Sequence, residues 1–397
     1  MREMTRSLRS LSLAAAASLA AVAGSGTQDL SAQEPRDDRP PLVIQRMGNF
    51  FVGGDYSTRN DTTRFVGQMY VEFAIPEQLT HRYPIVFIHG GGQIGSGWWR
   101  TPDGRQGWAL YFLRRGYAVY VVDQPARGRS AYNSELGPLG DPATVLRTQQ
   151  LWAASEQFDL WPAADLHTRW VGDAVPGDRT FDQFMRSQSD AIANISQQTL
   201  TADALVALLR RIGPAILVPH SQPGWAAWRV ADFRPNLVKA LIQLEPGPPA
   251  RLAAAPPFGA FEVPWGLSYD PLAYSPKVSD PSELQFVEVP VTDDPYVKSC
   301  WLQAEPAREL PNLQQVPILL LTSESGYNTL WDPCTHRYLE QAGVNHTWIR
   351  LPEVGILGNG HFFFIEENSN EVANVLRQWL ATHVQDQTSG SDATAPQ

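Results

Sequence analysis

The chain has 397 residues, of which 43% are hydrophobic and 18% are charged, so it holds enough apolar material for a large folded core. This composition excludes a disordered or fibrous protein. Lys and Arg number 31 against 41 Asp and Glu, and the net charge of −10 offers no basic surface for a nucleic-acid backbone, so no nucleic-acid partner is expected.

The first 23 residues have the pattern of a secretory signal peptide. Basic residues, of which Arg9 is the last, precede an apolar run of mostly Ala and Leu from Leu11 to Ala23. Cleavage after Ala23 obeys the small-x-small rule, and Ala32 ends a second candidate site. The run is short for a membrane span, although an uncleaved anchor is the alternative. The sequence therefore predicts a secreted or periplasmic protein without stable membrane insertion.

One domain is expected over residues 43–384, between a flexible leader (24–42) and a flexible polar tail (385–397). Its first part, 47–52 and 67–73, has the pattern of a strand pair separated by a stretch rich in Gly, Asp, Thr and Asn. Short continuous apolar runs, which are typical of buried parallel strands, follow at 84–88, 117–122, 215–218, 238–244, 317–321 and 346–351.

Helical spacing occurs between several of these runs, at 108–112, 205–212 and 369–380. Strands that alternate with helices through short connections predict an α/β fold, with a mostly parallel central sheet and helices on both faces. Two stretches, 131–199 and 247–313, are too long for simple connections and are interpreted as cap-like insertions. Their many Trp, Phe and Tyr residues either form small cores of the insertions or line a substrate pocket.

Glycines follow the first of the parallel strands directly, in the segment His89-Gly90-Gly91-Gly92. Backbone N–H groups without neighbouring side chains can approach an anion closely, so Gly91 or Gly92 is a candidate donor to an oxyanion. The segment lacks the Lys-Ser/Thr pair of a nucleotide-binding loop. Asp123, at the end of the next apolar run, is predicted to order its own loop rather than to take part in chemistry.

The densest signal is the segment 215–225, in which an apolar strand runs into Ser221 and then into a helix-compatible stretch. This arrangement predicts a nucleophile elbow, with the Ser221 hydroxyl above the sheet and the Gln222 N–H facing the same volume. Pro219 and Pro223 replace the glycines that usually flank such a serine. Pro223 can open the following helix. An ordinary serine in a strand–helix turn is the alternative for this segment.

A nucleophilic serine needs a base and an acid that orients the base. His361 lies in a Gly-Asn-Gly-His segment between the last predicted strand and the final helix, and it is the predicted base. Three carboxylates are candidates for the acid, because Glu245 ends one apolar run and Glu324 and Asp332 follow the next. Glu245 is favoured as the single carboxylate at the end of its run. Each choice keeps the chain order of serine, acid and histidine.

Cys300 and Cys334 are the two cysteines of the chain. An even number in an exported protein favours a disulfide between them, and two buried thiols are the alternative. The eight histidines are scattered, and no Cys/His spacing resembles a zinc site. Neither a metal nor another cofactor is therefore expected.

The glycine segment 89–92, the segments 123–130 and 220–222, Glu245 and the Gly-Asn-Gly-His361 segment together resemble the α/β-hydrolase superfamily, over about residues 47–384. More narrowly, they resemble a group of exported bacterial serine esterases. In that group the nucleophile lies in a His-Ser-Gln segment, the acid is a Glu after the sixth strand, and the base follows a Gly-Asn turn. The resemblance gives these roles to Ser221, Glu245 and His361. The chain departs from the group in its two prolines beside Ser221, and it lacks the neighbouring cysteine pair that some relatives carry near the oxyanion loop.

These residues predict a secreted serine hydrolase that cleaves small or polymeric carboxylic esters through an acyl-enzyme intermediate. A lactonase, or a hydrolase of polymer or aromatic esters, on the same triad is the alternative within catalysis. A non-catalytic extracellular binding protein on a hydrolase fold is the alternative outside it. Dehalogenase and epoxide-hydrolase chemistry would need an Asp at the position of Ser221.

Overall fold

The computed structural model of the protein describes residues 39–384 apart from 141, 193–195 and 254–256. The predicted signal peptide (1–23), most of the predicted leader and the predicted tail (385–397) lie outside the described residues. Among the described helices, none combines the length and the hydropathy that a bilayer span requires.

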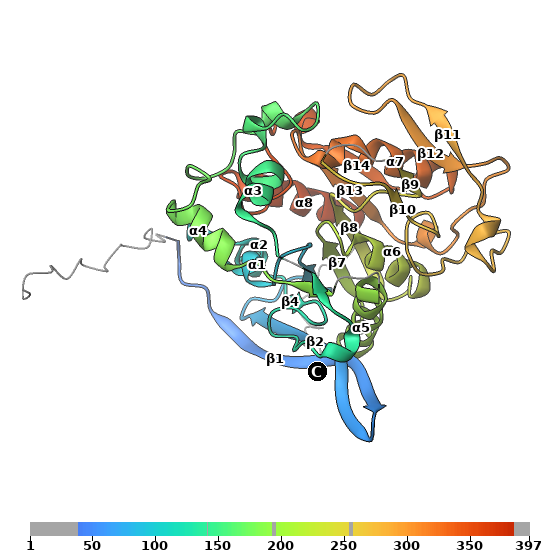
Figure 1. Ribbon diagram of the computed structural model, residues 1–397. Coiled ribbons are helices and arrows are strands. Elements are labelled where there is room, and N and C mark those ends of the chain that lie inside the picture. The colour runs from blue at the N-terminus through green and yellow to red at the C-terminus, as the bar shows by residue number, and fades with distance from the viewer. Residues whose placement is uncertain (1–38, 141, 193–195, 254–256, 385–397) are drawn as a thin grey trace, which may run out of the picture. The chain divides into compact units, whose positions relative to one another are not determined.

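Within the described residues, eight strands form one mixed sheet (Figure 1). The two strands at the N-terminal edge pair antiparallel with each other and with their neighbour, and the remaining pairs are parallel. The apolar runs of the sequence are these parallel strands, which confirms the predicted sheet. In spatial order the strands are β1 (Ile44–Arg59), β2 (Thr62–Pro76), β4 (Val119–Asp123), β3 (Ile85–Ile88), β7 (Ala215–Pro219), β8 (Val238–Leu244), β13 (Ile318–Thr322) and β14 (Thr347–Arg350).

The hairpin of β1 and β2 turns within the connecting stretch that the sequence predicts, but both strands extend further into that stretch than predicted. Gly53 and Gly54 lie inside β1, and the turn is made by Asn60 and Asp61, both with positive φ, as a two-residue hairpin turn requires. A Cβ on Gly53 would lie 2.9 Å from the Cα of Ala204 in a neighbouring helix. The glycine therefore permits a close approach of helix and strand instead of reversing the chain.

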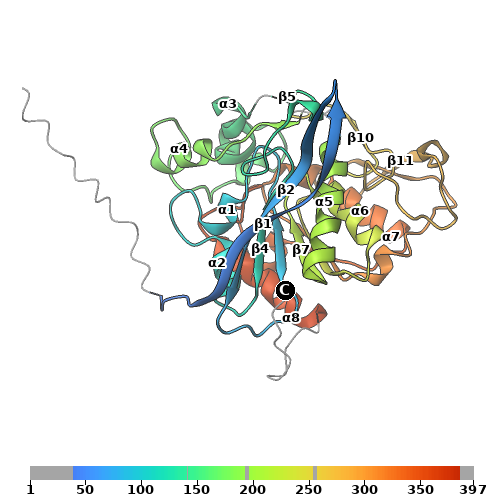
Figure 2. The same ribbon diagram turned by 90° about the horizontal axis from the view of Figure 1, so that it is seen from below.

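Helices cover both faces of the sheet, as predicted. Successive residues of β7 belong to different apolar clusters, because the side chains of a strand alternate between its faces. Figure 2 shows α5, α6 and α7 on one side of the sheet and α2 on the other. The first side carries α5 (Ser196–Ile212), α6 (Gly224–Phe233) and α7 (Asp332–Gln341), and the second carries α1 (Ser96–Trp99), α2 (Trp108–Leu113) and α8 (Ser369–His383).

The helix α5 begins earlier than its apolar spacing indicates. Its first residue, Ser196, falls inside the range that was predicted as an insertion. Gln197 and Gln198 in the first turn are polar yet buried, and Gln197 donates from Nε2 to Pro125 O and to Thr201 Oγ1. Because hydrogen bonds rather than apolar contacts bury this turn, hydrophobic periodicity does not reveal it.

The two long stretches contain short helices and small two-stranded sheets. Their aromatic residues pack in cores: Phe181 packs within the first stretch, and Trp152 and Phe184 contact Phe362, the neighbour of His361, whereas the lining of a substrate pocket stays a prediction. The elements of the first stretch are η1 (Ser134–Leu136), β5 (Leu139–Gly140), α3 (Val145–Thr148), the π-helical turn η2 (Gln149–Ala153), η3 (Ser155–Gln157), η4 (Ala164–Leu166), α4 (Arg179–Arg186) and β6 (Ala191–Ile192). Those of the second are β9 (Arg251–Leu252), β10 (Phe261–Glu262), η5 (Pro281–Glu283), β11 (Phe286–Pro290) and β12 (Ser299–Gln303), followed by η6 (Leu313–Gln315).

Cys300 in β12 and Cys334 in α7 form a disulfide, as predicted. The bond ties the second long stretch to α7, a helix that packs on one face of the central sheet. Both sulfur-bearing residues are buried beside the apolar cluster that underlies α7.

Candidate active site

Ser221 lies on the turn between β7 and α6, with a φ of 63° that is unusual for a residue with a side chain. Two backbone hydrogen bonds hold the turn, from Ser221 N to Leu244 O at 2.9 Å and from Gly224 N to Ser221 O at 2.9 Å. Pro219 ends β7 and Pro223 is the N-cap of α6, so both prolines occupy element ends. Proline is tolerated at the ends of strands and helices, so these two positions can hold proline in place of the usual glycine.

His361 and Glu245 contact each other deep in the protein. The Nδ1 atom of His361 lies 2.6 Å from Oε2 of Glu245, and both side chains are buried. Ser323 donates its backbone N–H and its hydroxyl to the other oxygen, Oε1, at 2.7 and 2.5 Å. Glu245 follows β8, Ser323 follows β13, and His361 lies in the loop between β14 and α8. All three therefore meet at the carboxyl edge of the sheet.

Burial acts on the pKa of both partners. It lowers the pKa of His361 well below the ordinary value, so the imidazole is neutral at neutral pH. It raises the pKa of the Glu245 carboxyl, while the two donors of Ser323 oppose this shift by stabilising the charged form. A neutral imidazole whose Nδ1–H donates to Glu245 leaves Nε2 free to accept a proton.

The other two candidate acids have different partners. Glu324 accepts from the backbone N–H of Gly358 at 2.5 Å and so supports the loop that carries His361. Asp332 accepts from Thr322 Oγ1 at 2.7 Å and from Asn328 Nδ2 at 3.1 Å. Among the described contacts, neither carboxylate reaches the His361 ring.

The glycine turn after β3 lies beside the serine. A Cβ on Gly90 would be 3.1 Å from Cβ of Ser221, and one on Gly91 would be 3.9 Å from Cβ of Gln222. Gly92 has a φ of +70° and lies against Gln188 and Trp152. The turn thus brings Gly90 next to Ser221 and Gly91 next to Gln222, because β3 and β7 are neighbours in the sheet, whereas Gly92 faces the first long stretch.

Tyr327, in η7 (Tyr327–Leu330), is a residue of this site that the sequence analysis missed. Its ring lies 4.3 Å from the ring of His361, and the phenol is near enough to Ser221 and Trp152 for both to affect its pKa. Burial raises the pKa of the phenol, which therefore stays neutral and can donate. A search among all residues that follow β13, rather than among carboxylates alone, would have found it.

Known proteins resemble this chain in sequence and in fold. No protein-family model matches the chain. The fold is similar to the atomic-resolution structure of a novel bacterial esterase, with a TM-score of 0.59 and 23% identity, over 88% of this chain and 99% of that one. The chain is also 41% identical over 335 residues to the probable secreted lipase phiG of Fungal sp. (strain ATCC 74256), covering 83% of this chain and 88% of the lipase.

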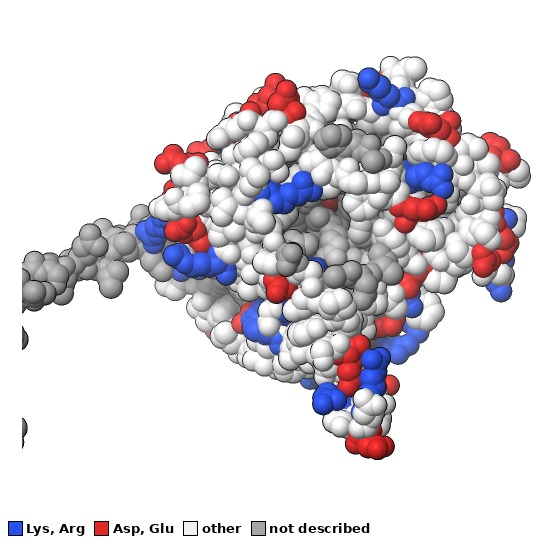
Figure 3. Space-filling view, in the orientation of Figure 1, with Lys and Arg blue, Asp and Glu red and all other residues white. Residues whose placement is uncertain are grey.

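The chain belongs to the α/β-hydrolase superfamily. It is a carboxylic ester hydrolase. The surface of this α/β-hydrolase is hollowed at the centre of the face shown in Figure 3. The hollow lies in the region where Figure 1 draws β7 and β8. The carboxyl ends of parallel strands are where such folds place their sites.

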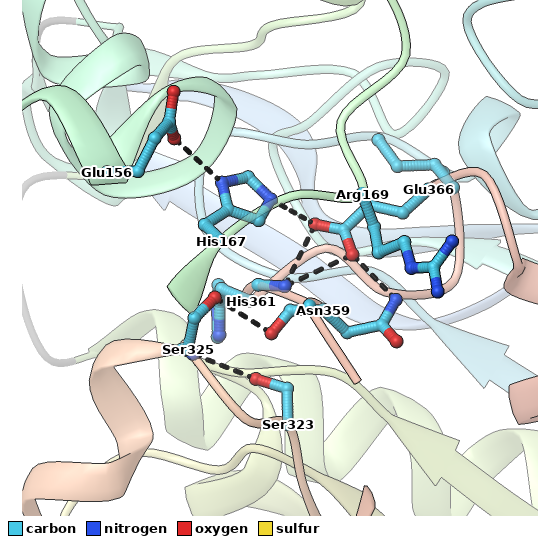
Figure 4. A network of polar contacts seen from close by, with 12 residues as sticks. Glu156, His167, Arg169, Ser323, Ser325, Asn359, His361 and Glu366 are labelled. Atoms are coloured by element: carbon cyan, nitrogen blue, oxygen red, sulfur yellow. Dashed lines mark hydrogen bonds and ion pairs between the residues drawn. The ribbon is translucent and has the colours of Figure 1, made fainter. Parts of the chain in front are cut away.

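A buried polar network supports the His361 loop of the hydrolase (Figure 4). Glu366 accepts from Gly360 N at 3.1 Å and from Asn359 Nδ2 at 2.8 Å. Its Oε1 also lies 2.9 Å from Nε2 of His167, whose Nδ1 is 3.5 Å from Glu156 in the first long stretch. Burial by itself lowers the pKa of His167, but the two carboxylates outweigh it and raise the pKa to about 9.

Asp123 has the loop-ordering role that the sequence predicts for it. The buried carboxylate accepts from Gly95 N at 2.7 Å and from Arg129 N at 2.9 Å, and it pairs with Arg129 Nε at 2.8 Å. These contacts fix the loop after β4 against the segment that follows the glycine turn.

Proposed function

We propose that this hydrolase is an exported serine esterase in which Ser221 is the nucleophile, His361 the general base and Glu245 the acid that orients the base. The observation that supports it most is the 2.6 Å contact between His361 Nδ1 and a buried Glu245 carboxylate, at the sheet edge where Ser221 occupies a strained turn. Tyr327 packs against His361 and lies near Ser221, which supports a common site for the two residues.

In the proposed reaction, His361 moves a proton from the Ser221 hydroxyl to the leaving group. His361 Nε2 takes the proton of the Ser221 hydroxyl as the oxygen attacks the ester carbonyl. The oxyanion that forms accepts from the backbone N–H of Gln222 and from that of Gly91 or Gly92. His361 then gives its proton to the leaving alkoxide. Water, activated by the same imidazole, releases the acid and regenerates Ser221.

Apolar side chains at this site favour esters with an apolar or aromatic part. Tyr327 lies near the serine, Trp152 lies against Gly92, and Phe258 packs against Tyr327 with ring centroids 4.7 Å apart. The lipase relative supports a lipid or small-molecule ester as substrate. A series of p-nitrophenyl esters of increasing acyl length, extended to lactones and polyesters, would rank these classes.

Export is part of the proposal. The basic and apolar pattern of residues 1–23, the disulfide and the secreted lipase relative support it. Mass spectrometry of protein recovered outside the cytoplasm should give a chain that starts at Gly24 or Gln33. An intact Met1 on such protein would contradict cleavage.

The triad is tested with a fluorophosphonate probe and two substitutions. Wild-type protein should be labelled on Ser221, and Ser221→Ala should abolish labelling and lower kcat by on the order of 10⁶-fold. Glu245→Gln should keep some labelling and lower kcat by about 10⁴-fold, because the imidazole loses its orienting charge. Ser282→Ala, at an exposed position in η5, is the matched control. Undiminished ester hydrolysis by Ser221→Ala would contradict the assignment of Ser221 as the nucleophile.

A further inference from the structure

Arg127 carries a buried charge that no acidic side chain compensates. It follows β4 and is 1% exposed. Among the described residues, no carboxylate lies within ion-pair distance of its guanidinium, whereas Arg129, two positions later, pairs with both Asp123 and Glu72. Burial lowers the pKa of Arg127 only to about 10, so the group stays charged at neutral pH. A buried cation without a counter-ion is costly and calls for a function.

The guanidinium is hydrogen-bonded to both walls of the proposed oxyanion hole. One terminal nitrogen donates to Gly90 O at 2.8 Å, and the other donates to Gln222 Oε1 at 2.7 Å. The carbonyl of Gly90 and the N–H of Gly91 belong to the same peptide group. Arg127 therefore touches the peptide that provides one predicted donor and the side chain of the residue that provides the other.

His89 acts on the same carbonyl. Its Nε2 accepts from the backbone N–H of Gln124 at 3.0 Å, so the proton of this neutral ring is on Nδ1, which donates to Gly90 O at 3.0 Å. Burial lowers the pKa of His89 to about 4, which keeps the ring neutral. With the longer bond from the backbone N–H of Gln93 at 3.4 Å, the Gly90 carbonyl accepts three hydrogen bonds, one of them from a cation. Donors to a peptide oxygen polarise the N–H at the other end of that peptide.

We propose that Arg127 is a positioning residue of the oxyanion hole, which orients and polarises the N–H donors of Gly91 and Gln222. The negative charge of the tetrahedral intermediate then compensates the positive charge of the buried guanidinium. This inference rests on the proposed serine mechanism. It explains why the cation lacks a carboxylate partner, since a permanent counter-ion would cancel the field that Arg127 directs at the hole. A ground-state ester, which is neutral, gains little from that field.

Arg127 should therefore act on the transition state and leave substrate binding unchanged. Loss of an oxyanion donor itself costs about 10²- to 10³-fold in kcat, so loss of the group that orients and polarises two donors should cost about 10- to 100-fold. We expect Arg127→Met to lower kcat by this factor, with KM for p-nitrophenyl butyrate unchanged. Arg127→Lys, which keeps the charge but reaches one acceptor at a time, should recover part of the loss.

Phenylboronic acid separates this role from a merely structural one. The Ser221 oxygen bonds to boron and its proton passes to His361, which makes the boron a tetrahedral anion. The inhibition constant for Arg127→Met should rise by the same factor as kcat falls. Arg115→Met, which removes an exposed arginine just beyond the C-terminal end of α2 and away from the site, is the control and should change neither quantity.

The outcomes are distinct. Unchanged kcat and boronate affinity in Arg127→Met, with Ser221 still labelled by a fluorophosphonate, would overturn the role of Arg127 and leave the triad intact. Absence of labelling in the wild type would instead overturn the serine mechanism. If Arg127→Met does not fold, Gln222→Ala keeps the backbone donor but removes one hydrogen bond from Arg127. That variant should lower kcat and boronate affinity together by about 10-fold, which corresponds to the weaker end of hydrogen bonds from a charged donor, and equality with wild type would refute the inference.

Discussion

Deprotonation of His167 is expected to weaken the folded hydrolase at alkaline pH. The imidazole is buried between Glu366 at 2.9 Å and Glu156 at 3.5 Å, and its pKa rises from 6.5 to about 9 because these carboxylates outweigh the effect of burial. A group whose pKa is higher in the folded than in the unfolded state stabilises the fold fully below the unfolded value. It loses that contribution as the pH rises through the folded value. The window here runs from about pH 6.5 to somewhat above pH 9.

The size of the effect follows from the two pKa values. Raising a pKa from 6.5 to about 9 corresponds to about 3 kcal/mol of stabilisation by the bound proton. The side chain of His167 is 1% exposed, so solvent screening reduces this figure little. Because Glu366 holds Gly360 and Asn359, the loss should also loosen the loop that carries His361.

The measurement compares wild type with His167→Gln, which cannot bind the proton. Urea unfolding followed by tryptophan fluorescence gives the free energy of unfolding of both proteins from about pH 6 to about pH 10. The difference between them should shrink by about 3 kcal/mol over this range. In His346→Gln, a control in which burial lowers the pKa of the replaced histidine, the difference should stay constant above about pH 7. A difference for His167→Gln that does not change with pH would refute the reasoning.

Two further predictions concern the base and the disulfide. Burial disfavours the charged imidazole of His361 and so lowers its pKa below 6.5. For a neutral ester, kcat/KM should therefore fall at acid pH with an apparent pKa below 6.5, because protonated His361 can no longer accept the Ser221 proton. A rate profile between about pH 4 and about pH 8 measures it, and a midpoint above 6.5 would contradict the assignment. Replacing both cysteines, with Cys300→Ser and Cys334→Ser, should lower the free energy of unfolding by about 3 to 4 kcal/mol, because the bond closes a loop of 34 residues. Denaturant titration tests this, and a loss below about 1 kcal/mol would be too small for a bond that restrains the unfolded chain.

Several features of the fold could be predicted because they leave a local pattern. Parallel strands are buried on both faces and appear as continuous apolar runs, which is how β3, β7 and β13 were found. Elements held by polar contacts or by close packing leave a weaker pattern. The first turn of α5 and the second half of β1 are not predicted for this reason, since buried glutamines and a pair of packed glycines imitate loop sequence.

The choice among the three candidate acids could not be made from the local sequence pattern. Glu245, Glu324 and Asp332 all follow strands that end at the same edge of the sheet, so their order along the chain does not separate them. Packing separates them, because Ser323 and His361 both contact Glu245, while Glu324 and Asp332 bond elsewhere.

The amino-acid sequence alone determined the layered α/β architecture, the position of Ser221 on a strand–helix turn and the histidine before the last helix. These depend on neighbours within about ten residues. Only the tertiary structure decided that His167, Arg127 and Tyr327 reach the site. Each belongs to a loop or an irregular segment, where no periodicity fixes the direction of a side chain, and each meets its partners through contacts between segments far apart in the chain.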